Sequence, residues 1–254
     1  MLIIYKVREM GYRLDIFFFL YFTLSLTFFN QFNGIRQYIA VYIMLYAVLQ
    51  LMDEKYVFFV FLTIVAGLFH ISAYFLLPLI LLQIIIRKKL PLKFVLIVLS
   101  GMFLLSFINL DRIYDKILVY IPMYKYYIKS SYMERLTFES IITKIPKMAI
   151  VLFSVLKIDY DNIRKEDTFL VNMSLIACGI LILSFTSSII WRFYQYFDMY
   201  LIFPVMILMH DKQKKAYSDL IAIALIIMLI TKIIIMPRGE YLYKSILFKK
   251  NPIN

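Results

Sequence analysis

Arginine and amide side chains stand at the head of a long apolar run, FNGIRQYIAVYI, at residues 32–43. Asn33, Arg36, Gln37 and Ala40 follow the spacing i, i+3, i+4 and i+7, which places them on one face of a helix. The guanidinium group is a planar fork that binds phosphate oxygens with paired hydrogen bonds, and amides hydrogen-bond sugar hydroxyls. The stretch therefore predicts a site for a phosphorylated sugar or, alternatively, an interfacial arginine held by lipid phosphate.

A second stretch, WRFYQYFDM at residues 191–199, repeats the pattern nearer the end of the chain. Arg192, Gln195, Tyr196 and Met199 have the same helical spacing. Two arginine forks at one depth would bind a diphosphate, and their charge would stabilise it as a leaving group. We therefore expect the two stretches to converge on one anion site, with the amides and the tyrosine positioning sugar or phosphate.

His70 lies in the chain between these two stretches. A histidine exchanges a proton near neutral pH, so His70 can take a proton from an acceptor hydroxyl or bind phosphate as a cation. A hydrogen-bonded structural role is the alternative. The acidic residues form no DxD or paired-carboxylate motif, so we predict no metal and no cofactor. The chain also lacks the P-loop, GxSxG and HExxH motifs that an ATPase, a serine hydrolase or a zinc protease would need.

The composition indicates the environment in which these side chains act. Of the 254 residues, 63% are hydrophobic and the mean hydropathy is +0.82, whereas a soluble domain carries about 45–50% apolar residues. We predict an all-α, polytopic integral membrane protein that forms a single domain over residues 1–254. The net charge of +12 is then explained by cytoplasmic loops that meet anionic lipid headgroups, and we predict no nucleic-acid partner.

Hydropathy windows of about 17–25 residues predict about nine transmembrane helices. The run at 56–86 is long for one crossing, and its flanking lysines and arginines stay on one side only if it makes two short crossings broken around His70. The other expected spans are 14–29, 33–52, 94–108, 147–156, 168–190, 193–209 and 220–236.

This count places the basic residues between spans on the cytoplasmic side, as the positive-inside rule requires. The opposite, outer side then holds Arg36, His70 and Arg192, together with a tyrosine-rich loop at 110–146. The sidedness strengthens the prediction of one outer site. The residues assigned to the cytoplasmic side are Lys6, Arg8, Arg13, Lys55, Arg87, Lys88, Lys89, Lys93, Lys157, Arg164, Lys165, Lys212, Lys214 and Lys215.

The same residues carry a resemblance to a known family. The pattern N-x-x-R-Q-x-x-A, followed by a helix, a polar turn, a second apolar run and F-H-x-S, resembles the EpsG-like group of polysaccharide polymerases, relatives of the Wzy O-antigen polymerases. The stretch WRFYQYFDMYLIFPVMIL is similar to a second block of that family. The matching residues are Asn33, Arg36, Gln37, Ala40, Phe69, His70, Ser72, Arg192, Tyr196, Phe197 and Pro204.

The resemblance implies a glycosyltransferase-type enzyme of the bacterial plasma membrane, with a glycosyltransferase-C-like architecture. It would join polyprenyl-diphosphate-linked oligosaccharide repeat units outside the membrane, in O-antigen, capsule or exopolysaccharide synthesis. Partners would include chain-length regulator and flippase proteins. Family members usually carry additional spans before the N-x-x-R-Q block, so we expect some N-terminal spans to be missing. The alternatives are a transporter or flippase for the lipid-linked glycan and a non-catalytic membrane subunit of an assembly complex.

Overall fold

The computed structural model describes residues 1–25, 27–107, 141–160 and 162–232, and every secondary-structure element among them is helical. The all-α prediction is therefore confirmed for this part of the chain. The elements, in which η1 is a π-helix and the other η segments are 3-10 helices, are α1 (Leu2–Glu9), α2 (Leu14–Leu20), η1 (Tyr21–Ser25), α3 (Thr27–Asn30), η2 (Gln31–Asn33), α4 (Ile35–Met52), α5 (Tyr56–Phe69), η3 (Ile71–Leu76), α6 (Leu79–Ile86), α7 (Leu92–Leu105), α10 (Ile145–Lys157), α11 (Lys165–Leu183), η6 (Ser184–Thr186), α12 (Ser188–Tyr194), η7 (Asp198–Leu201), α13 (Ile202–His210), η8 (Lys212–Lys214) and α14 (Lys215–Ile230).

The first expected span, 14–29, is not one straight helix. It divides into α2, the π-helix η1 and α3. Hydroxyl side chains explain the irregular turn, because Thr23 Oγ1 donates to the Phe19 carbonyl at 2.7 Å and Ser25 Oγ donates to the Tyr21 carbonyl at 2.9 Å. Such bonds compete with the helical ladder and bend helices. The expected span is therefore helical but irregular, and its continuous apolar helical part is Leu14–Ser25.

The expected break at His70 is confirmed. Helix α5 ends at Phe69, His70 is extended at φ −153° and ψ 114°, and the chain continues as η3. Gly67 permits this hairpin, because a methyl group at that position would overlap the ring of Tyr74. The two short helical segments therefore pack closely, with His70 at the turn between them.

The second half of the chain turns back earlier than expected. The expected span 168–190 ends as helix α11 at Leu183, after which Ser184 Oγ and Thr186 Oγ1 donate to the carbonyls of residues 181 and 183. The Ser187 hydroxyl then accepts from the Ile189 amide and caps α12. These hydroxyl groups end one helix and begin the next, so Arg192 belongs to the returning segment.

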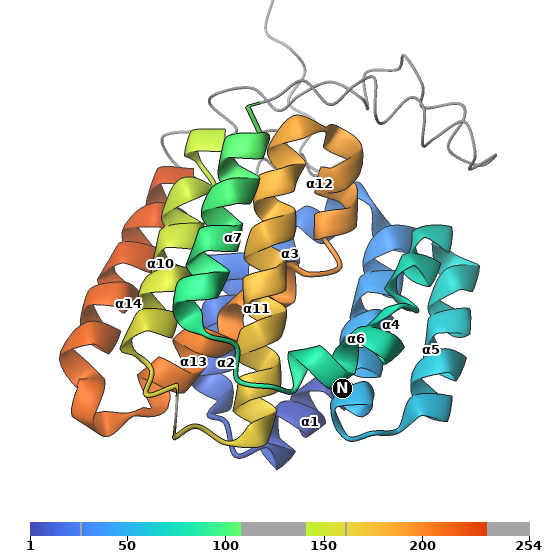
Figure 1. Ribbon diagram of the computed structural model, residues 1–254, viewed down its shortest axis with the longest axis horizontal. Helices are drawn as coiled ribbons and strands as arrows, with labels where there is room; N and C mark the ends of the chain where they lie inside the picture. The colour runs from blue at the N-terminus through green and yellow to red at the C-terminus, as the bar shows by residue number, and fades with distance from the viewer. Residues whose placement is uncertain (26, 108–140, 161, 233–254) are drawn as a thin grey trace, which may run out of the picture.

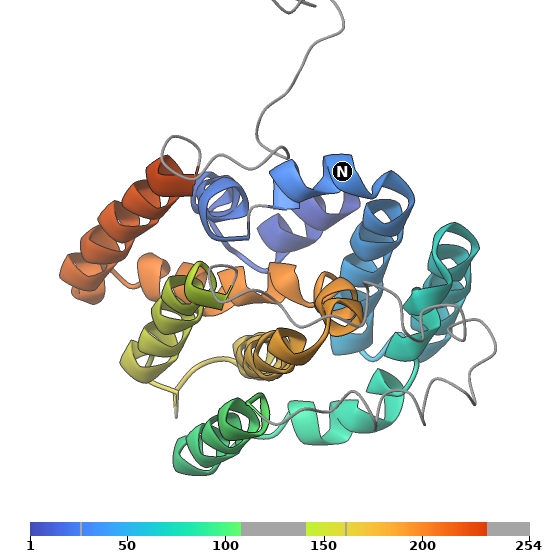
Figure 2. The ribbon, with the colours of Figure 1, turned by 90° about the horizontal axis from the view of Figure 1, so that it is seen from above.

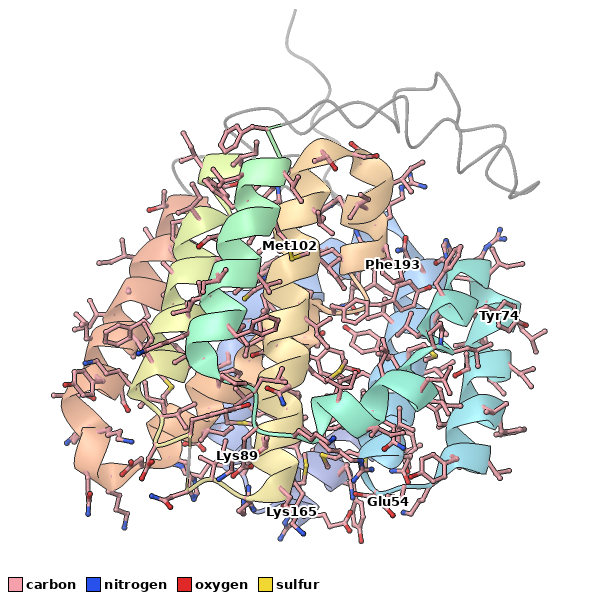
Figure 3. The ribbon with its side chains drawn as sticks, in the orientation of Figure 1. Glu54, Tyr74, Lys89, Met102, Lys165 and Phe193 are labelled. Carbon is pink, nitrogen blue, oxygen red and sulfur yellow. The ribbon has the colours of Figure 1, made fainter. Side chains whose placement is uncertain are left out.

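Helix α11 occupies the middle of the helical layer, between α7 on one side and α13 on the other (Figures 1 and 2). Gly179 allows the thioether of Met102 on α7 to approach its backbone, at 3.1 Å from the position a methyl group would take. The ends of the layer are α14 and the α4–α5 hairpin (Figure 2). The labelled residues Glu54, Lys89 and Lys165 lie at one end of the helices (Figure 3), and the assignment of this end to the cytoplasmic side stays a prediction.

The outward faces of the layer are apolar. Val57 on α5, Leu81 on α6 and Ile97 on α7 are 86%, 75% and 69% exposed, and such broad apolar surfaces suit lipid rather than water. By length and composition alone, two helical stretches are long and apolar enough to cross a bilayer, Ile35–Met52 and Lys165–Thr186, and four shorter apolar helices accompany them. The count of nine spans and the glycosyltransferase-C-like architecture stay predictions. Most of the expected outer loop at 110–146 lies outside the described residues.

Candidate functional site

A pocket of about 620 Å³ opens where the start of α4 faces α12 and the turn at His70. It contains five of the side chains that the sequence singles out: Arg36, Gln37, His70, Arg192 and Gln195. Two arginines and a histidine line it, and none of its lining residues in the described part of the chain is a carboxylate, so this lining favours an anion. The described residues that line it are Asn30, Phe32, Gly34, Ile35, Arg36, Gln37, Tyr38, His70, Trp191, Arg192 and Gln195.

Arg36 stands in the first turn of α4 and is exposed. It makes no hydrogen bond or ion pair with any residue that the structure describes. A cation at the N-terminal end of a helix also faces the positive end of the helix dipole, which is unfavourable. The local structure therefore gains nothing from the charge of Arg36, whereas an anion in the pocket would gain from both the guanidinium group and the helix end.

Gln37 ties the two arginine-bearing segments together. Its Nε2 donates to the Arg192 carbonyl at 2.8 Å, and the residue is only 8% exposed. This bond joins the first turn of α4 to the last turn of α12, which lie 155 positions apart in the sequence. The two predicted polar stretches do meet, and Gln37 holds them together.

The His70 ring belongs to a hydrogen-bonded triangle. Its Nδ1 lies 2.6 Å from Ser72 Oγ and 3.3 Å from the Tyr196 hydroxyl, and these two hydroxyls are 3.0 Å apart. When Nδ1 carries the proton and donates to Ser72, Nε2 is left as the acceptor. A histidine so oriented can act as a general base.

The surroundings of the His70 ring favour its neutral form. Burial lowers the pKa of His70 below its usual value, and the charge of Arg192 lowers it further. A neutral imidazole can accept a proton, whereas a cation cannot. The surroundings therefore favour the role of base over the role of cationic phosphate ligand.

Tyr196 is fully buried and does not line the pocket. The expectation that Arg192, Gln195, Tyr196 and Met199 share one helical face is wrong, because α12 ends at Tyr194 and the following residues form a turn. The turn sends Tyr196 behind the pocket, toward the His70 ring. Its hydroxyl is placed to orient the histidine instead of touching a ligand.

Gln195 is the better candidate for contact with a ligand. It lines the pocket, and its Oε1 is buried without a hydrogen-bond partner among the described residues. A buried acceptor without a partner costs about 1–3 kcal/mol, and a donor on a ligand would remove that penalty. A sugar hydroxyl is such a donor.

Asn33 does not share a helical face with Arg36 and Gln37. It ends the 3-10 helix η2, and Gly34, at φ −159° and ψ 59°, separates it from the start of α4. The placement of its side chain lies outside what the structure describes. Asn30, which sequence reasoning missed, lines the pocket in this region.

Trp191 is another lining residue that helical spacing did not indicate. Its ring stacks on Tyr194 with centroids 5.1 Å apart, and Lys144 Nζ lies 4.4 Å from its centroid. Two features of the sequence could have indicated Trp191 as a pocket residue: it precedes Arg192, and it is the one tryptophan of the chain.

Comparison with known protein families identifies the family of this chain. The model of the EpsG family matches residues 1–245, a range that includes every residue lining the pocket. No curated protein and no solved structure matches the chain.

Proposed function

The chain belongs to the EpsG family, a family of membrane proteins in polysaccharide biosynthesis, and from this premise we propose that it polymerises polyprenyl-diphosphate-linked oligosaccharide repeat units at the outer face of the bacterial plasma membrane. The observation that carries the proposal is the pocket itself. It combines two arginines with a histidine whose pKa is lowered by burial and by Arg192, and no carboxylate stands among the described residues that line it. These groups match a diphosphate leaving group and a hydroxyl nucleophile.

In the proposed reaction, the pocket binds two lipid-linked glycans. The guanidinium groups of Arg36 and Arg192 hold the diphosphate of the donor. As the bond between the anomeric carbon and the diphosphate breaks, the bonding electron pair leaves with the diphosphate, and the two positive charges stabilise it. Polyprenyl diphosphate is the product released.

His70 acts on the acceptor in this scheme. Its Nε2 removes the proton from a sugar hydroxyl while the oxygen forms a bond to the anomeric carbon of the donor. Ser72 supports this assignment, because its hydroxyl lies 2.6 Å from Nδ1 and, in the tautomer with a proton on Nδ1, accepts a hydrogen bond that fixes the ring. The Gln195 carbonyl oxygen accepts a hydrogen bond from a sugar hydroxyl, which satisfies its buried acceptor. Gln37 lines the same site, and contact of Asn33 with the sugar or phosphate stays a prediction.

The glycan of cells that lack this protein tests the proposal. We expect a ladder of long chains to collapse to a single repeat unit, and we expect the wild-type protein to restore the ladder. Loss of every outer glycan would overturn the proposal in favour of a flippase. Full restoration by a His70→Gln variant at wild-type abundance would overturn it in favour of a non-catalytic subunit.

A further inference from the structure

A buried ion pair lies behind the pocket and takes no part in the proposed reaction. Lys147 Nζ on α10 contacts the carboxylate of Asp198 on η7, and each side chain is only 8% exposed. The same carboxylate oxygen accepts a hydrogen bond from the Tyr194 hydroxyl. Thr27 Oγ1 lies 3.4 Å from the other oxygen, and Lys147 Nζ lies 3.4 Å from the Ser25 carbonyl.

Stability alone is a poor explanation of this pair. Removing two charges from water is costly, and apolar residues of similar volume often replace a buried ion pair without loss of stability. Lys147 is also the third residue of α10, where a cation faces the positive end of the helix dipole. Both effects make the ion pair unfavourable for stability at this position. Its contribution is to fix the relative positions of α10, η7 and Tyr194.

The segment that needs a fixed geometry is α12. It has seven residues, and isolated helices shorter than about 12–15 residues are marginal in water, so tertiary contacts must hold it. On the pocket side, Gln37 binds the Arg192 carbonyl. On the far side, Tyr194 connects the ion pair to Trp191, because its hydroxyl binds Asp198 while its ring stacks on the indole.

We propose that Lys147, Asp198 and Tyr194 form a positioning network that holds α12 in the orientation in which Trp191 and Arg192 line the pocket. The network touches no substrate and acts through α12. The inference rests on the proposed function, because it assigns to Arg192 the role of binding a diphosphate. Its loss weakens diphosphate binding through Arg192 and leaves the contribution of Arg36 on α4 unchanged.

The test uses the full-length protein in nanodiscs and a polyprenyl diphosphate as the probe. The variant Lys147→Met/Asp198→Leu replaces the pair with apolar side chains. We expect normal abundance and an affinity for the probe that is about tenfold lower. The matched control is Lys6→Met/Asp53→Leu, which removes a pair at the other end of the helices and should leave the affinity unchanged.

A double-mutant cycle separates positioning from general damage. Adding Arg192→Ala to the apolar pair should cause little further loss, because Arg192 is already misplaced, whereas adding Arg36→Ala should cause the same loss as in the wild-type background. Equal additional losses from both arginine variants, or wild-type affinity in the folded apolar variant, would overturn the inference.

A variant that fails to fold does not end the test. Tyr194→Phe keeps the ion pair and the ring stacking and removes one hydrogen bond, and we expect it to be abundant with an affinity about threefold lower. Unchanged affinity in Tyr194→Phe would overturn the inference. If wild-type protein binds no polyprenyl diphosphate, the proposed function fails and this inference fails with it, whereas binding by the wild type with unaffected variants refutes this inference alone.

Discussion

Arg36 and Arg87 lie at opposite ends of helix α4 and differ in what surrounds them. Arg87 Nε donates to Gln83, its Nη2 donates to the carbonyls of Leu51 and Met52 at 2.9 Å each, and its Nη1 lies 3.2 Å from Glu54. Arg87 therefore caps the C-terminal end of α4 by donating hydrogen bonds to its last carbonyls. Arg36 starts the same helix and has no hydrogen-bond or ion-pair partner among the described residues.

The pockets around the two arginines differ in the same way. Arg87 lines a cavity of about 540 Å³ whose wall also carries Lys165 and three carboxylates, those of Asp53, Glu54 and Glu166. The pocket at Arg36, of about 620 Å³, carries two arginines and a histidine, and no carboxylate stands among the described residues that line it. The two pockets are similar in volume but differ in the charge of their walls, and of these two the pocket at Arg36 is the one that suits a diphosphate. An arginine becomes a candidate for binding when the protein has not already used its donors.

The largest effect is expected when the proposed base, His70, is removed from the pocket at Arg36. We expect His70→Gln to lower turnover by about 10²–10⁴-fold, the usual contribution of general acid–base catalysis, while binding of the lipid-linked substrate changes little. Polymerisation in membranes with matched protein levels measures the first quantity, and binding of polyprenyl diphosphate measures the second. Weaker binding with unchanged turnover of bound substrate would make His70 a phosphate ligand.

The second prediction concerns Arg87, at the C-terminal end of α4. Arg87→Ala leaves two helix-terminal carbonyls without their charged donor, and each such hydrogen bond contributes about 1.5–3 kcal/mol. We therefore expect a lower unfolding temperature in detergent and less protein in the membrane, with normal activity per molecule that remains. Arg36→Ala is the matched control, and its abundance should equal that of the wild type. Equal loss of protein in both variants would remove the contrast between the two arginines.

The pH profile sharpens the assignment of His70. The pKa of His70 is lowered from its usual value of 6.5 by burial and by the charge of Arg192, and the base must be neutral to act. Activity should therefore persist to below pH 6.5 and fall as the pH drops through the lowered pKa. Arg192→Gln removes the smaller of the two causes, so the acid limb of its residual activity should move to higher pH. If the acid limb of Arg192→Gln stays at the wild-type pH, the charge of Arg192 does not influence the titration of His70.

The smallest expected effect comes from the hydroxyls that orient the histidine. Ser72→Ala removes the group at 2.6 Å from Nδ1, and a hydrogen bond between neutral groups contributes about 0.5–1.5 kcal/mol. We expect a loss of turnover of about two- to tenfold, with unchanged substrate binding and unchanged abundance. Ser72→Thr keeps the hydroxyl and should retain more activity than Ser72→Ala. If Ser72→Ala lowers the abundance of the protein but not its turnover per molecule, the hydroxyl has a structural role only.

Part of this site could be predicted because its signals are local or follow from general rules. The chemistry of phosphate binding singles out Arg36 and Arg192, and the positive-inside rule places both at the same end as His70. The break at His70 follows from the length of the apolar run. These inferences need only composition, spacing and charge, and the pocket brings the three residues together.

The remaining features depend on backbone details and on long-range pairs. The shared face of Asn33 and Arg36 fails because Gly34 leaves the helical conformation, and Tyr196 leaves its expected face because α12 ends two residues before it. Lys147 and Asp198 are 51 positions apart, and a single pair at that separation leaves no periodic pattern. Periodicity assumes a continuous helix, and short helices violate that assumption at this site.

The central claim is that Arg36 is retained to grip the diphosphate of a lipid-linked glycan. The most direct measurement compares polymer length and yield for Arg36→Ala and Arg36→Lys in membranes with matched protein levels. Lysine keeps the charge but loses the paired hydrogen bonds of the guanidinium fork, so both variants should be abundant and should polymerise about tenfold or more below wild type. Near-wild-type polymer from abundant Arg36→Ala protein would contradict the claim and leave this arginine as an interfacial anchor.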